Sequence, residues 1–379
     1  MKVKLTDVCE IQYGFAFDSS RFTEDSKYIP LVRIRDVKRG FSETFYSGEY
    51  MKEYVLHKDA LLIGMDGEFN IARWKDRDAL LNQRVCKLTA KKGINEEYIR
   101  FLMSKCLKKI EQKTAFVTVK HLSAKELNSL EVDMPLFNEQ NTIANTLLKI
   151  ENIIELRKRE IQYLDNLIKA RFVEMFGDMY LNSKGWPETK LENMADVVSG
   201  ITKGRKTRNE DLTEVPYMSV SNVKDGYIDW RTIKTIEATQ QEIAQYRLLP
   251  NDVLMTEGGD PDKVGRGAII KEPLKNCIHQ NHIFRVRLNE SMMLPEFFAE
   301  YLQHQRSKRY FLGCAKQTTG IASINMKQLR ALPVLVPPLS DQERFVLFKT
   351  QVNKSKFEVQ KALDKTQILF DSLMQKYFG

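Results

Sequence analysis

Two long segments of the chain space their apolar residues every three or four positions, the pattern of an α-helix with one buried stripe. The first segment, residues 139–176, contains no proline or glycine, and Asn138 and Gly177 are its candidate N-cap and C′ residues. Its apolar steps alternate between four and three, as in the heptad of a coiled coil. Arg157 and Arg171 interrupt this stripe, which consists of Ile143, Leu147, Ile150, Ile154, Ile161, Leu164 and Ile168.

The second helical segment repeats the first without a gap. Pro135 corresponds to Pro337 and Gln140 to Gln342, and both segments end in Phe-Gly. Lys349 interrupts the second stripe, as Lys356 does, and the stripe contains Phe345, Val352, Val359, Leu363, Phe370 and Leu373. Because neither stripe is expected to stay exposed, we expect the two helices to pair antiparallel, as two halves of a pseudo-two-fold dimer would. The alternative is that each helix packs on its own domain.

The duplication continues upstream, where the loops differ in length but the landmarks keep their order. Residues 29–34 resemble 215–220, residues 59–62 resemble 252–255, and Asn82-Gln83 resembles His279-Gln280. The sequence therefore predicts four parts: a domain at 1–134, a helix at 135–177, a related domain at 178–335 and a second helix at 336–379. A helix of this length extends about 57 Å.

Within the domains, short strand patterns alternate with helical ones. We expect strands at 29–37, 61–64 and 80–88, and helices at 95–109, where Asn95 is a natural start, and at 296–306. The predicted fold class is α+β: two similar mixed α/β domains separated by two long antiparallel helices that form a coiled-coil spacer.

Composition limits the classes of function. The net charge of +9 favours a polyanionic partner such as nucleic acid, although it also serves solubility. Five cysteines stand singly, and only His279 and His282 have a spacing found among metal ligands, which we interpret as that of polar residues at a strand edge. We therefore expect reduced thiols in the cytoplasm and no metal or other cofactor. No run is apolar enough for a membrane span, and the charged first ten residues predict no secretory signal.

Polar loops between the predicted strands supply candidate DNA contacts, because Arg and Lys can bind guanine, Asn and Gln can bind adenine, and backbone amides can hold phosphates. For any single residue, a solvated loop charge is the alternative. Gln83 and Gln280 occupy matching places. They are interpreted either as buried amides that tie a loop to the sheet or as contacts to DNA bases. The candidates are Arg33, Arg35, Asn70, Arg73, Lys75, Lys120, Lys203, Arg205, Lys206, Ser221, Asn222, Lys263, Arg266, Thr318 and Thr319.

Three stretches resemble the specificity subunits of type I restriction–modification systems. Residues 13–22 look like the opening of that family's target recognition domain, and residues 62–69 through Asn82-Gln83 look like its central segment. The proline-led entry into a long helix occurs twice, as Pro-Leu-Phe-Asn-Glu-Gln at 135–140 and Pro-Pro-Leu-Ser-Asp-Gln at 337–342, and it is similar to the family's spacer region. Residues 263–268 resemble the domain again. The doubled arrangement covers the whole chain.

The resemblance implies a subunit that reads a bipartite double-stranded DNA site, one half with each recognition domain. The paired helices would fix the spacing and dock two methyltransferase subunits, and restriction subunits would join through that complex. The sequence itself has no Asn/Asp-Pro-Pro-aromatic motif, no Gly-x-Gly after a strand and no Walker loop, so we expect a non-catalytic protein. The other classes are an assembly protein with two protein-binding domains and a fused nuclease.

Overall fold

A computed structural model describes residues 1–113, 120–205, 211–260, 264–318 and 320–379. The chain forms two compact units, and each of the two long helices contributes to both. Unit 1 comprises residues 1–159 and 360–379, and unit 2 comprises residues 160–359. Among the described residues, no helix is both long and apolar enough to cross a bilayer.

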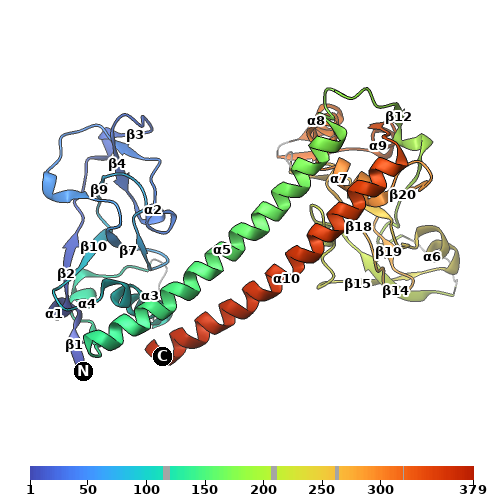
Figure 1. Ribbon diagram of the computed structural model, residues 1–379. Coiled ribbons are helices and arrows are strands. Elements are labelled where there is room, and N and C mark those ends of the chain that lie inside the picture. Colours follow the sequence, from blue (N-terminus) through green and yellow to red (C-terminus); the bar gives the residue numbers. More distant parts are fainter. Residues whose placement is uncertain (114–119, 206–210, 261–263, 319) are drawn as a thin grey trace. The chain divides into compact units, whose positions relative to one another are not determined.

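Unit 1 begins with short elements that build its sheets and one longer helix (Figure 1). Its elements before the long helix are β1 Lys2–Lys4, α1 Leu5–Val8, β2 Cys9–Tyr13, η1 Ser19–Arg21, β3 Phe22–Thr23, β4 Ile29–Val32, α2 Ile34–Arg39, β5 Phe45–Tyr46, η2 Lys52–Tyr54, β6 Val55–Leu56, β7 Leu61–Gly64, β8 Asn70–Arg73, β9 Ala79–Leu81, β10 Val85–Ala90, α3 Glu96–Lys113, α4 Ala124–Asn128 and β11 Glu131–Asp133.

Unit 2 repeats this plan with longer loops. Its elements between the long helices are β12 Glu188–Lys190, η3 Leu191–Asn193, β13 Ala195–Ser199, β14 Thr213–Met218, η4 Val220–Asn222, β15 Lys234–Ala238, α6 Gln240–Tyr246, β16 Val253–Thr256, β17 Gly258–Gly259, β18 Gly267–Ile269, β19 Ile278–His279, β20 Ile283–Leu288, α7 Pro295–Tyr301, α8 Gln305–Cys314, β21 Lys316–Thr318, β22 Ile321–Ser323, α9 Met326–Arg330 and β23 Pro333–Leu335.

The sheets confirm the mixed α+β class and the duplication. Each unit has an antiparallel four-stranded sheet, in the order β2-β10-β7-β8 in unit 1 and β13-β20-β16-β18 in unit 2. A second sheet in each contains one parallel pair, β4 with β9 and β14 with β19. A two-stranded ribbon, β1 with β11 or β12 with β23, joins the start of each domain to the segment before its long helix.

Three predicted elements are placed differently by the structure. Residues 29–37 form a strand only to Val32, because the buried Asp36 carboxylate accepts the Arg33 backbone N–H at 3.0 Å and starts a helical turn. The predicted strand 80–88 is two strands, separated by a turn at Arg84, whose φ is +70°. The helix predicted at 296–306 is divided between α7 and α8. Asn95 caps α3 as predicted, since its side chain accepts the Tyr98 N–H at 2.9 Å.

Backbone hydrogen bonds show which residues of the two units are equivalent. Phe15 N donates to Leu81 O and Phe15 O accepts from Gln83 N, whereas Ile201 N donates to His279 O and Ile201 O accepts from Asn281 N. Leu81 therefore matches His279, Asn82 matches Gln280 and Gln83 matches Asn281. The prediction that Gln83 and Gln280 occupy matching places is wrong by one residue. The register of the strands decides which residues correspond, and a resemblance between neighbouring side chains does not reveal that register.

A second alignment error has the same cause. Asp59 and Asn251 both have positive φ, and their N–H groups donate to Trp74 O and Ile270 O at 2.8 Å each. The counterpart of Asp59 is thus Asn251 and not Asp252, which the sequence pattern had suggested. Asp252 is instead buried, and it accepts two hydrogen bonds from Arg287.

The long helices are α5, Phe137–Phe176, and α10, Leu339–Phe378, of 40 residues each. The N–H groups of Glu139 and Gln140 both reach Leu136 O, so Asn138 lies in the first turn and is not the N-cap. The predicted C′ residue is confirmed: Gly177 has φ +75° and donates to Val173 O at 2.8 Å.

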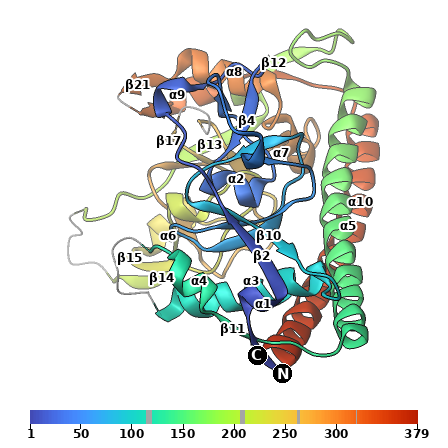
Figure 2. The ribbon, with the colours of Figure 1, turned by 90° about the vertical axis from the view of Figure 1, so that its left-hand side faces the viewer.

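The pairing of the helices is visible within each unit (Figure 1, Figure 2). In unit 1, Leu373 and Phe378 near the end of α10 join the core cluster that contains Leu147 near the start of α5. In unit 2, Phe345 near the start of α10 packs with Phe172 near the end of α5. The beginning of one helix thus meets the end of the other in both units, which confirms the antiparallel pairing.

Polar residues that interrupt the apolar stripes have specific partners. Arg157 donates to Ala362 O at 2.6 Å and also contacts the Thr366 hydroxyl. Lys356 pairs with Asp165 at 2.6 Å. Because each of these half-buried cations has a partner on the opposite helix, the bonds favour one register of the two helices over a shifted one.

Candidate nucleic-acid interface

The thirteen residues predicted to pair the helices are all buried or half-buried. Eight of them belong to the two main core clusters or pack against them, and the other five belong to neither cluster. The buried ones are Ile143, Leu147, Ile150, Ile154, Ile168, Phe345, Val352 and Leu363. The half-buried ones are Ile161, Leu164, Val359, Phe370 and Leu373.

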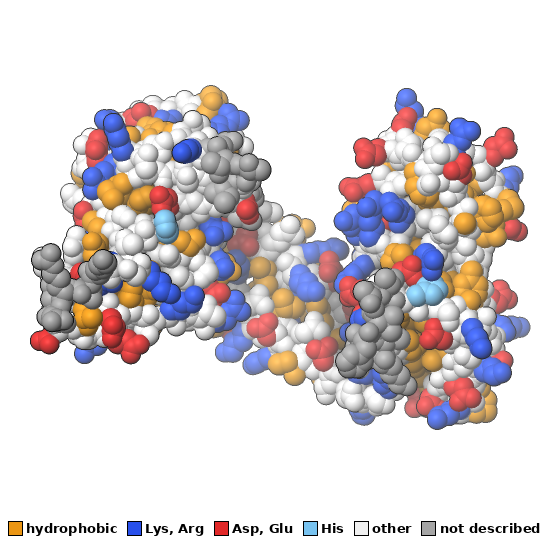
Figure 3. All heavy atoms as spheres, turned by 180° about the vertical axis from the view of Figure 1, so that it is seen from behind, with side chains coloured by type: hydrophobic (Ala, Val, Ile, Leu, Met, Phe, Trp, Pro, Cys, Tyr) orange, Lys and Arg blue, Asp and Glu red, His pale blue; other side chains and the backbone are white. Residues whose placement is uncertain are grey.

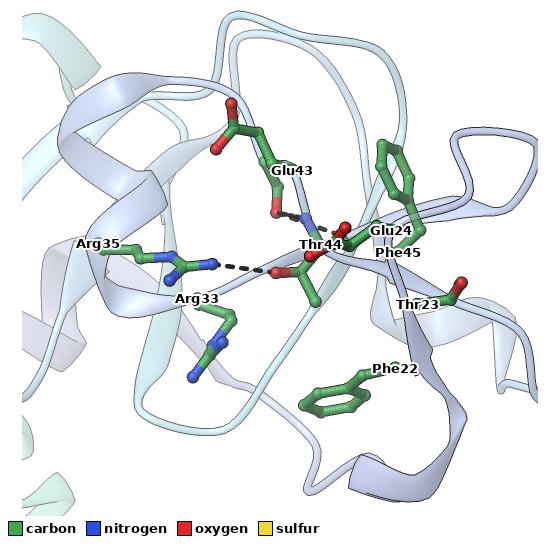
Figure 4. A pocket seen from close by; sticks show the side chains of 9 residues that line it. Phe22, Thr23, Glu24, Arg33, Arg35, Glu43, Thr44 and Phe45 are labelled. Carbon is green, nitrogen blue, oxygen red and sulfur yellow. Dashed lines mark hydrogen bonds between the residues drawn. The ribbon is translucent and has the colours of Figure 1, made fainter.

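Three of the candidate DNA contacts in unit 1 are exposed cations: Arg33, Arg35 and Lys75. Arg33 and Arg35 flank a cleft of about 800 Å³ between the start of α2 and the strands β3 and β5 (Figure 4). Arg35 Nη2 donates to Thr44 Oγ1 at 3.2 Å, and its Nε lies 3.5 Å from Asp36. The Arg33 guanidinium has no hydrogen-bond or ion-pair partner among the described residues, so it is available to a ligand.

Other unit 1 candidates are held by partners inside the unit. Arg73 donates to Glu96 at 2.9 Å and pairs with Glu97, which ties β8 to α3. Burial raises the pKa of Glu97, but its ion pairs with Arg100 and Arg73 outweigh this and hold that pKa below its usual value. Lys120 pairs with Glu111 at 2.9 Å, and Asn70 donates to Glu68 O. The main role of these side chains is therefore to stabilise the fold of unit 1.

In unit 2, Lys203 and Ser221 are exposed, whereas Arg205 forms a two-pronged ion pair with Glu242. The Arg205 hydrogen bond holds the pKa of the Glu242 carboxyl below its usual value. Asn222 is fully buried, and its amide binds Asp229 O at 2.9 Å. Asn222 is thus a scaffold residue and not a surface group.

Two of the remaining candidates, Arg266 and Thr318, belong to the described residues of unit 2. Arg266 is half-buried, and its Nε has no partner among the described residues. Thr318 belongs to β21. Lys206, Lys263 and Thr319 lie outside the described residues.

A charged cluster at the end of β7 in unit 1 could not be predicted from the sequence. His121 contacts Asp66 and lies 3.0 Å from Arg84 Nη1, and Arg84 Nε lies 3.6 Å from Asp66. Its members come from three separate loops, so only the fold brings them together.

Unit 2 has a histidine–carboxylate pair at the equivalent strand end. His282 Nδ1 lies 2.5 Å from Glu257 there. On the face in Figure 3, histidine side chains lie beside acidic ones, and basic side chains are scattered over each unit.

The described surface offers charged and hydrogen-bonding side chains. Among the described residues, no three His, Cys, Asp or Glu side chains gather as metal ligands. All five cysteines are free, and burial raises the pKa of Cys9, Cys86 and Cys277 to about 12, so these thiols stay protonated and unreactive.

Comparisons with known proteins agree with this arrangement. The family model described as "Type I restriction modification DNA specificity domain" matches residues 1–166 and 183–367. The EcoBI specificity subunit of Escherichia coli is 26% identical over 408 residues, which cover 100% of this chain and 85% of the relative. The StySPI specificity subunit of Salmonella potsdam is 21% identical and covers 93% of this chain and 82% of the relative.

Solved structures share the fold. The S subunit of a type I restriction–modification system from M. genitalium superposes with a TM-score of 0.58 at 16% identity, covering 100% of this chain and 96% of that one. A chain from a study of complex assembly in the type I system has a TM-score of 0.53 at 16% identity, covering 100% and 97%. With its doubled domains, paired helices and family match over both halves, this chain belongs to the type I restriction–modification DNA specificity family.

Proposed function

We propose that this chain is the DNA-reading, non-catalytic subunit of a type I restriction–modification complex. Residues 1–134 and 178–335 are the recognition domains, and each reads one half of a bipartite double-stranded DNA site. The helices 135–177 and 336–379 set the distance between the halves. The observation that carries this proposal is the duplication: one backbone plan occurs twice with different exposed side chains, and two 40-residue helices accompany it.

The geometry of the helices supports a spacer role. At 1.5 Å per residue, a 40-residue helix extends about 60 Å, comparable to roughly 17 base pairs before the reach of the domains is subtracted. The bonds of Arg157 to α10 and of Lys356 to α5 fix the register of the pair. A spacer whose register is fixed holds one length.

Exposed apolar residues on the helices support docking of protein partners. Leu156 and Tyr163 of α5 are 62% and 70% exposed, and Phe357 and Ile368 of α10 are 66% and 69% exposed. Apolar side chains left in solvent on a paired helix mark a protein-binding surface. We assign this surface to the binding of methyltransferase subunits. Two of them are expected because the plan of the chain is duplicated. Restriction subunits join through that complex, in the cytoplasm.

An exchange of one domain tests the division of labour. Replacing residues 1–134 with the corresponding domain of another specificity subunit should change one half of the methylated motif and leave the other half and the spacing intact. The motif is measured by sequencing modified bases in cells that express the chain with its methyltransferase subunits. A change in both halves would show that the domains do not read separately, and the absence of any bipartite motif in the wild type would favour the assembly-protein alternative.

Changing the helix length tests the spacer. Inserting four residues, about one helical turn, at matched positions of α5 and α10 should lengthen the unread gap by one or two base pairs, since four residues add about 6 Å. Both half-site sequences should remain. The control exchanges Glu160 and Lys361, both exposed, for alanine without changing length. An unaltered gap after the insertion would reject the spacer model.

A further inference from the structure

The turn after β4 and its counterpart after β14 share one backbone scaffold. Val32 pairs with Leu81 in the parallel pair of unit 1, and Met218 pairs with His279 in unit 2. In the next residue of each unit, the backbone N–H donates to a buried side chain three positions on: Arg33 to Asp36 at 3.0 Å, and Ser219 to Asn222 at 2.9 Å. Arg33 and Ser219 thus occupy equivalent places on a rigid turn.

On this common scaffold, the two units carry different side chains: polar groups with partners in unit 2 and an exposed cation in unit 1. In unit 2, the Ser219 hydroxyl donates to Asn222 Oδ1 at 2.6 Å, and Gln280 Oε1 accepts the Val220 N–H at 3.3 Å. These polar groups are satisfied within the unit. In unit 1, position 33 carries instead an exposed guanidinium with no partner among the described residues.

A second observation in unit 1 points to a missing ligand. Asn82, the counterpart of Gln280, is only 6% exposed, and its Oδ1 has no hydrogen-bond partner among the described residues. Asn82 lines a cleft of about 320 Å³ together with Arg33, Arg35 and Arg84. A buried carbonyl oxygen without a donor costs free energy that a bound donor would recover. The described residues that line this cleft therefore include a free donor fork, on Arg33, and an unsatisfied acceptor, on Asn82.

The restraint of the neighbouring Arg35 and the donor geometry of the guanidinium both suit the Arg33 side chain to contact a base edge. The hydrogen bond of Arg35 to Thr44 and its contact with Asp36 hold the neighbouring guanidinium aside, and Figure 4 shows Arg33 between Arg35 and Phe22. Five N–H donors in a planar fork match the O6 and N7 acceptors of guanine in the major groove. Serine at the equivalent place of unit 2 cannot make this two-pronged contact.

We propose that Arg33 specifies a guanine in the half-site read by the first recognition domain, with Asn82 accepting a hydrogen bond from a base amino group beside it. This inference rests on the proposed function, since it requires that unit 1 reads DNA. It predicts a G·C pair in one half-site and no equivalent contact from Ser219 in the other.

The test compares the loss of two arginines, one at each end of α2, in the complete methyltransferase. DNA is selected from a randomised pool by the complex of the chain with its methyltransferase subunits, for the wild type, Arg33→Ala and Arg39→Ala. Arg33→Ala should reduce the preference for one G·C pair about 5- to 150-fold and leave the other half-site unchanged. Arg39→Ala is the matched control, because Arg39 is the last residue of α2, is exposed and pairs with Glu43 at 3.6 Å.

The outcomes separate this inference from the proposed function. If the wild type selects a bipartite motif but Arg33→Ala retains every preference, or weakens all sequences evenly as a lost phosphate contact would, the inference is wrong and the proposed function stands. If the wild type selects no motif, both fail. Arg33→Gln should move the preference at the same pair from guanine toward adenine, and retention of guanine would also overturn the inference. Recovery of each variant in the complex, with an unchanged thermal midpoint, checks folding.

Discussion

Replacing Phe345 with alanine is expected to lower the free energy of unfolding of unit 2 by about 3–5 kcal/mol. Phe345 is fully buried on α10, and its ring centroid lies 5.2 Å from Phe172, 5.7 Å from Phe176 and 6.3 Å from Phe297. These rings come from α5 and α7, so alanine removes contacts with two other helices at once. Rigid helices close only partly around the space left, which adds the cost of a cavity to the lost burial.

Urea unfolding monitored by hydrogen exchange in peptides of unit 2 measures this loss. Phe357→Ala is the matched control, since Phe357 lies on the same helix and is 66% exposed. It should change the free energy of unfolding by no more than about 0.5 kcal/mol. Equal effects of the two substitutions would mean that the aromatic cluster does not join α10 to the rest of unit 2.

Unit 2 is expected to lose about 2 kcal/mol of stability between pH 6.5 and pH 5 through His279 alone. Burial lowers the pKa of His279 to about 4, and the positive charge of Arg285 acts in the same direction, while the acceptor Ile283 O opposes it. The unfolded chain takes up a proton near pH 6.5 and the folded chain does not. The stability that unit 2 gains from a neutral His279 is therefore fully present above pH 6.5 and is lost as the pH falls toward 4.

His279→Leu isolates this effect, because leucine is what unit 1 carries at the equivalent place, Leu81. His279 is fully buried, and its Nε2 has no partner among the described residues, so an apolar side chain suits the site. The variant should have a stability profile that is flatter by about 1.4 kcal/mol per pH unit over this range, measured by urea unfolding at pH 7.5 and pH 5. Parallel profiles for the two proteins would show that His279 is not the group that titrates.

The repeat and the two helices could be predicted from the sequence because they depend on local and periodic information. A run without proline or glycine, an apolar stripe and a glycine at the end determine α5 through to Gly177, whose φ is +75°. The offset between Pro135 and Pro337 reveals the duplication. Such signals need only residues close in the chain, or a copy of them.

The short elements show where local information ends. Residues 33–37 have strand-like composition, yet the buried carboxylate of Asp36 turns the chain into α2. A pattern of hydrophobic residues does not reveal that a side chain will accept the hydrogen bond of a backbone N–H in place of a neighbouring strand. The one-residue errors at Gln83 and Asp59 have a related origin, since only hydrogen bonds between strands fix the register.

The sequence alone determined the family plan: two related domains, two helices of one length and a basic surface without catalytic motifs. Only the tertiary structure decided which cations are free, because Arg73 and Arg205 find carboxylates at Glu96 and Glu242, while Arg33 finds none among the described residues. The physical reason is that the availability of a charge depends on partners far along the chain, whereas helix periodicity depends on neighbours.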